Sequence, residues 1–197
     1  MKLQPNFSAL LTALFFITTI ILGITSCNQH PKMEANKDIA EVQNESRFPD
    51  TCEANDAQFL VNAAYMNYHQ IALGQLAKAK TQTPEILVFA QMMIDEHTKS
   101  MTDIKLIADK KNVTLPPSAE NDTEGDNNQL LKISGRKFDK AYSDLMVGDH
   151  KEAIVKFENV IEEGMDNDIR NWASITLPIL KLHLGKAIEC QKRMVSM

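Results

Sequence analysis

The chain has 197 residues, a formal net charge of −5 at pH 7 and a hydrophobic fraction of 44%. The acidic balance and the lack of any basic run exclude the electrostatic footprint of a nucleic-acid-binding protein. The length suits one well-buried domain and is too short for two. Glycine-rich phosphate loops, nucleophile elbows and Cys-x-x-Cys pairs are absent from the sequence, so we assign no catalytic residue and expect a non-enzymatic protein.

The first 26 residues have the pattern of a secretory leader. Lys2 gives a short positive start, residues 9–24 form an apolar run, and Ile24-Thr25-Ser26 precedes Cys27. This ending resembles a bacterial lipobox, in which the cysteine is lipidated and becomes the mature N-terminus. We therefore predict that residues 1–26 are removed and that Cys27 carries acyl chains such as palmitate. Asn28 after the cysteine favours the outer membrane, so the expected location is the cell envelope, facing the periplasm.

Residues 27–55 are expected to be the lipidated cysteine followed by a flexible tether. The segment is polar, mixed in charge and poor in large apolar side chains, and it contains Pro31 and Pro49. The membrane would be reached through the lipid alone, because no cationic helix is present to bind it. Any protein or small-ligand partner is left open.

From residue 56 onward the apolar residues follow a helical period, which predicts an all-α domain over residues 56–193. Asp56 is a candidate N-cap for the first helix, and Pro178 lies inside the last. A long connection, which includes a short docking helix at Leu130-Leu131, joins the second and third helices. The pattern predicts an antiparallel four-helix bundle with one long connection. The expected helices span residues 56–80, 84–111, 134–163 and 166–193.

Several motifs occur in an order that resembles a known family. FAQMMIDEH, then LP after the second helix, then SGRKFDKAYSDLMVGDH and TLPILKLHL, are similar to the bacterial exported family catalogued as domain of unknown function 4142. The resemblance covers roughly residues 56–190 and implies a ferritin-like four-helix bundle. It implies no activity, because the family has none firmly assigned.

Two five-residue stretches share one pattern, MIDEH at Met93–His97 and MVGDH at Met146–His150. Residues four apart lie on one face of a helix, so each methionine lies one turn from its histidine. At least one polar or ionisable residue lies near the midpoint of each predicted helix, which predicts a polar layer at mid-height. The residues of this layer are Gln70, His97, Asp149, His150 and His183.

The layer has two interpretations. The favoured one is a set of inward histidines that hold helix register beside Gln70 and Asp149, in a binding or structural envelope protein. The alternative is a single copper or zinc ion bound by the histidines of the layer and by the methionines one turn away. A ferritin-type di-iron site is disfavoured, because Glu-x-x-His motifs are missing. The candidate ligands of the single copper or zinc ion are His97, His150, His183, Met93 and Met146.

Cys52 and Cys190 offer a test of connectivity. In a simple up-down-up-down bundle the end of the last helix lies near the start of the first, whereas a long crossover places the two at opposite ends. A Cys52–Cys190 disulfide would therefore count against the crossover, and its existence is left open.

Overall fold

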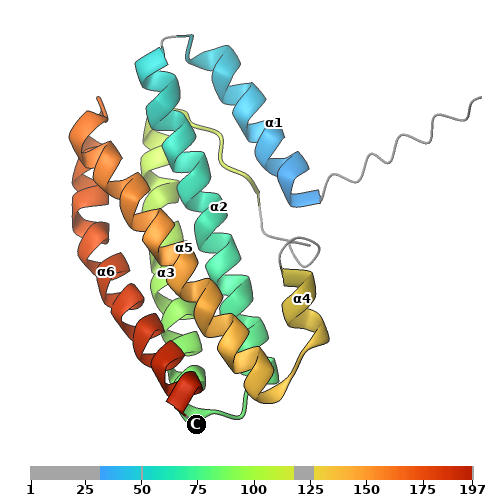
Figure 1. Cartoon of the computed structure of the whole chain (residues 1–197). Helices are drawn as coiled ribbons and strands as arrows, with labels where there is room; N and C mark the ends of the chain where they lie inside the picture. The colour runs from blue at the N-terminus through green and yellow to red at the C-terminus, as the bar shows by residue number, and fades with distance from the viewer. Residues whose placement is uncertain (1–31, 50, 118–126, 197) are drawn as a thin grey trace, which may run out of the picture.

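The computed structural model describes residues 32–49, 51–117 and 127–196, so the predicted signal peptide and Cys27 lie outside the described residues. The described residues form six helices and no strand, which confirms the all-α class (Figure 1). None of these helices is long and apolar enough to cross a membrane. In chain order they are α1 Lys32–Arg47, α2 Thr51–Lys80, α3 Pro84–Lys111, α4 Asn127–Lys132, α5 Gly135–Glu163 and α6 Asn167–Ser196.

The four long helices, α2, α3, α5 and α6, form the predicted bundle (Figure 1). The closest packing occurs within two antiparallel hairpins, α2 with α3 and α5 with α6. In Figure 1, α3 ends at the upper end of the bundle, and α4, which leads into α5, lies toward the lower end. As a result α5 runs parallel to α3. One long crossover between two hairpins is the connectivity that ferritin-like bundles use.

Each long helix buries a stripe of side chains with a three-four spacing. In α3 the stripe runs from Ile86 to Ala108 and includes His97 at its middle. Gly74 lets α2 approach α3 closely, since a Cβ at this position would lie 2.8 Å from Ile94 Cγ1 and 2.9 Å from the Ala90 carbonyl oxygen. The close approach fixes the hairpin on which half of the mid-height layer sits.

The prediction of a flexible tether over residues 27–55 is wrong for most of this segment. Residues 32–47 form helix α1, which packs on α2. Polar contacts hold this helix. The Asn44 side chain donates to the Thr114 carbonyl oxygen at 2.9 Å and accepts from the Thr114 amide at 2.8 Å. Gln58 of α2 donates to Glu41 at 2.6 Å. The face of α1 that packs on the bundle is made of Ala40 and Asn44 and has no hydrophobic stripe. Hydrophobic periodicity in the sequence therefore does not predict this helix.

The predicted N-cap at Asp56 is also wrong, because α2 begins a full turn earlier, at Thr51. Asp56 is buried, and its Oδ2 accepts hydrogen bonds from the backbone amides of Met165 at 3.1 Å and Asp166 at 2.7 Å. The carboxylate therefore satisfies amides in the α5–α6 turn rather than those of its own helix.

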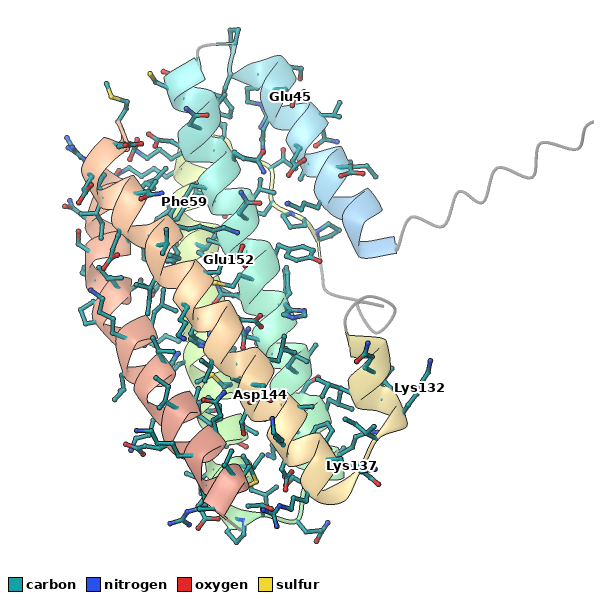
Figure 2. All side chains as sticks on the ribbon, viewed as in Figure 1. Glu45, Phe59, Lys132, Lys137, Asp144 and Glu152 are labelled. Carbon is teal, nitrogen blue, oxygen red and sulfur yellow. The ribbon has the colours of Figure 1, made fainter. Side chains whose placement is uncertain are left out.

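The core consists of two apolar clusters, one toward each end of the bundle. The upper cluster is built around Phe59, Phe157 and Trp172, with the two phenylalanine rings 5.0 Å apart between centroids. The lower cluster is built around Phe89, Phe138 and Tyr142. Figure 2 labels Phe59 near the upper end and Lys137, which precedes Phe138, near the lower end.

The two cysteines lie at opposite ends of the bundle and are not joined to each other. Cys52 is exposed at the start of α2, whereas Cys190 is buried in the lower cluster. This separation agrees with the crossover connectivity. Because burial raises the pKa of the Cys190 thiol, this side chain behaves as a small apolar group of the core.

Candidate metal centre

Three buried histidines meet between the two apolar clusters. His97 of α3, His150 of α5 and His183 of α6 are 2%, 1% and 1% exposed. One ring nitrogen of each lies within 4.8 Å of the others, and the ring centroids are 5.3 to 5.8 Å apart. Along each helix, the flanking stripe residues belong to the upper cluster on one side and to the lower cluster on the other. The histidines therefore form a polar layer that separates the two halves of the core.

The orientation of His97 is set by Asn67 of α2. The Asn67 amide nitrogen donates to the Ala63 carbonyl oxygen at 2.7 Å, which leaves its Oδ1 facing His97 Nδ1 at 2.8 Å. Because Oδ1 only accepts, Nδ1 must carry the proton. The other nitrogen, Nε2, then presents a lone pair, and no group of the described residues hydrogen-bonds to it.

His150 is oriented in the same way by its own helix. Its Nδ1 lies 2.8 Å from the Met146 carbonyl oxygen, which again makes Nδ1 the donor and leaves Nε2 with a lone pair. Within the described part of the chain, Nε2 of His150 and both nitrogens of His183 have no hydrogen-bond partner. Anchoring one ring nitrogen on an oxygen while the other stays bare is the arrangement of metal-binding histidines.

All three imidazoles are neutral at physiological pH. Burial lowers the pKa of His97 well below its usual value, and the neighbouring His150 and His183 lower it further. Burial also lowers the pKa of His150, although its bond to the Met146 carbonyl opposes the shift. Burial, helped by His150, lowers the pKa of His183 to about 4. The three nitrogens are therefore free of competing protons, as a metal ion requires.

The other residues predicted for the polar layer form a separate group on α2 and α5. Gln70 donates from Nε2 to Asp149 Oδ2 at 2.7 Å, and His69 Nε2 lies 3.7 Å from the same oxygen. Gln70 is buried and Asp149 is half-buried. Asp149 does not belong to the group whose ligand atoms meet around the three histidines.

Met93 and Met146 lie one helical turn from His97 and His150 and are fully buried in the lower cluster. Because the crossover makes α3 and α5 parallel, both methionines lie on the same side of the histidine layer. The repeated Met-x-x-x-His pattern thus marks equivalent positions on two helices. Coordination of an ion by either thioether stays a prediction.

Sequence reasoning missed Asn67. Asn67 is fully buried, on the face of α2 that packs against α3, and it is one turn after Ala63. The available signal was a polar residue on an apolar helical stripe, three positions before the Gln70 that was singled out. Hydrophobic periodicity alone gives no reason to prefer it over its polar neighbours.

A small cavity connects the histidine layer with the surface. It has a volume of about 70 Å³ and lies between α3 and α6, with Asn67 of α2 at its inner wall. His97 and His183 line it, and Glu96, Ser100 and Asp103 border it. The cavity therefore brings solvent next to two of the three histidines, although their unbonded ring nitrogens are themselves covered.

The donor set fits one transition-metal ion. Zinc–nitrogen bonds measure about 2.0–2.1 Å, so three nitrogens within 4.8 Å of one another need an inward movement of less than about 1 Å each. Imidazole suits both copper and zinc. The group contains no carboxylate among the described residues, and a di-iron carboxylate site does not fit it.

Fold and site together define the class, a four-helix bundle with one crossover and a buried three-histidine layer. The chain belongs to the family described as domain of unknown function (DUF4142), which matches residues 42–189. This match confirms the resemblance seen in the sequence. No curated protein matches the chain.

One solved structure with a similar fold is described as "CopM in the Cu(II)-bound form". The two share 15% sequence identity with a TM-score of 0.57, and the alignment covers 70% of this chain and 96% of that one. At this identity the likeness concerns the fold.

Proposed function

We propose that this protein binds a single copper or zinc ion through His97, His150 and His183. The observation that carries the proposal is the convergence of three buried ring nitrogens, two of them fixed as lone-pair donors by the bonds on the far side of their rings. Three neutral imidazoles from three helices make a preformed ligand set. The ion would join α3, α5 and α6 at mid-height.

The energetic cost of the apo site favours this function over a purely structural polar layer. A buried polar atom without a partner costs about 1–3 kcal/mol. Of the seven buried side-chain atoms without a partner in the described residues, four belong to the three histidines. The other three belong to three different residues, Gln70, Asp139 and Tyr142. An ion bound by one nitrogen of each ring would satisfy three of the four histidine atoms at one point.

Copper is the first ion to test. The solved neighbour was determined in a Cu(II)-bound form, and two buried thioethers lie one turn from the histidines. Thioether ligands select copper over zinc, whereas three imidazoles accept both.

Elemental analysis of protein purified without a histidine tag tests the proposal. We expect one copper or zinc ion per chain, lost in the double variant His97→Ala, His150→Ala. The matched control is His69→Ala, which removes a half-buried histidine outside the layer and should leave the ion bound. Metal-free protein that gains no stability from added copper or zinc would refute the proposal, and so would metal retained by the double variant.

We also propose that the chain is an exported lipoprotein anchored through Cys27 in the outer membrane. The support is the leader-like sequence that ends in Thr25-Ser26-Cys27. Labelling of cells with a palmitate analogue should mark the wild-type chain and not a Cys27→Ser variant. Equal labelling of both would contradict lipidation at this residue.

A further inference from the structure

The cavity between α3 and α6 meets the histidine layer from one side only. His97 and His183 form part of its wall, whereas His150 comes from α5 and does not line it. The side of the layer facing α5 is filled by His150, whose ring is fixed to the Met146 carbonyl oxygen. If the three rings held an ion, the cavity wall formed by His97 and His183 would be the side from which a further ligand could approach it.

The charge of the ligand set argues for a further ligand. Three neutral imidazoles leave the full positive charge of a divalent ion in a buried layer, and the described residues contribute no carboxylate to that set. A buried charge without a counter-charge is costly. The cavity of about 70 Å³ has room for a few water-sized groups, so the missing negative charge can come from solution.

We propose that the bound ion keeps one coordination position open to the α3–α6 cavity and binds a small monodentate anion there. The inference rests on the proposed metal site and specifies its fourth ligand. Three protein ligands with an open fourth position distinguish reactive zinc sites from closed structural ones. Ser100, half-buried on α3, lies where a larger side chain would narrow access to the cavity.

Azide titration of the Cu(II)-loaded protein tests the proposal, with copper stoichiometry measured first in every variant. We expect an azide-to-copper charge-transfer band that saturates at one azide per copper. Ser100→Leu should weaken azide binding by roughly tenfold or more while copper stays bound, because the new side chain occupies the path of the anion. Ser174→Leu is the matched control, since Ser174 is exposed on α6 and does not line the cavity.

Two further variants keep the test independent of a folding defect. Ser100→Ala removes the hydroxyl without adding bulk and should bind azide as the wild type does. Glu96→Gln removes the half-buried carboxylate at the cavity and should leave azide binding intact or stronger.

Three results would overturn the inference. Copper-loaded wild-type protein without an azide band would show that the protein itself fills the fourth position, while the metal site stands. Equal azide affinity in Ser100→Leu and Ser174→Leu would show that the anion does not use this cavity. Absence of bound copper in the stoichiometry measurement would refute the proposed function and the inference with it.

Discussion

The buried polar groups at the upper end of the bundle differ from those at its centre. At the upper end, Asp56 accepts two backbone amides of the α5–α6 turn, and Asn44 exchanges two hydrogen bonds with Thr114. At the centre, the outward nitrogens of His97 and His150 are bonded, yet the nitrogens that face one another have no partner among the described residues. The first group is satisfied within the fold, whereas protein groups of the described residues leave nitrogens of the second unbonded.

This difference separates a structural role from a binding role. Asp56 and Asn44 each join segments far apart in the sequence, so the apo fold accounts for them. In the histidine layer three helices meet through rings whose facing nitrogens have no partner among the described residues. Substitution of Asp56 should therefore lower the stability of the apo protein, whereas substitution of a layer histidine by an apolar residue should raise it.

The largest effect should come from the ion itself. A ligand that binds the folded state alone stabilises it by about 4 kcal/mol at a free concentration a thousand times its Kd. We expect copper or zinc to raise the free energy of unfolding by this order in chemical denaturation. The double variant His97→Ala, His150→Ala should show no gain, and an equal gain in both proteins would place the ion elsewhere.

Acid should weaken the apo protein before its carboxylates titrate. The pKa of His183 is about 4 in the folded state against 6.5 for the free side chain, so the unfolded chain binds more protons between these values. The contribution of neutral His183 to the free energy of unfolding is therefore fully present above pH 6.5. It falls by roughly 3 kcal/mol as the pH drops toward 4. Denaturant titrations across this range measure the loss of stability, which should be smaller in His183→Leu. If the stability of this variant depends on pH as that of the wild type does, His183 is not the titrating group.

Asp56→Ala should destabilise the protein by roughly 2 kcal/mol, because two half-buried backbone amides of the α5–α6 turn lose their carboxylate acceptor. Metal affinity should stay unchanged, since Asp56 lies at the end of the bundle. Chemical denaturation and metal titration of the same variant measure the two effects. A large drop in metal affinity would show that Asp56 also supports metal binding, so the two regions would not have separate roles.

Asn67→Leu should lower metal affinity by about 10- to 100-fold, the usual consequence of losing the group that orients a histidine ligand. Asn67→Asp keeps an acceptor for His97 Nδ1 and should restore most of the affinity. Competition with a chelating dye gives the affinities. Failure of the aspartate to rescue would indicate that Asn67 matters through packing alone.

The smallest effect on stability is expected for His183→Leu, and its sign is opposite to that of Asp56→Ala. His183→Leu replaces two unpartnered buried nitrogens with apolar volume, so the apo protein should gain about 1 kcal/mol while metal binding is lost. Thermal or chemical unfolding of metal-free protein measures this gain. A clear loss of stability would favour the register-holding role that the sequence suggested first.

The four long helices were predictable because apolar residues recur along them with a helical period, and their ends carry clear signals such as Pro84 and Gly164. Counting along those helices also placed His97, His150 and His183 at one level. Helix α1 was not predictable, since it docks through Asn44 and Ala40. Asn67 and the role of Asp56 depend on which helices become neighbours, and no local pattern in the sequence encodes that.

X-ray absorption spectroscopy of copper-loaded, tag-free protein shows directly whether the three histidines hold the ion. We expect three imidazole nitrogens at about 2.0 Å from the copper ion. This signature should disappear in the variant His97→Ala, His150→Ala and persist in His69→Ala. A first shell without imidazole scattering, or one unchanged by the double substitution, would contradict the account.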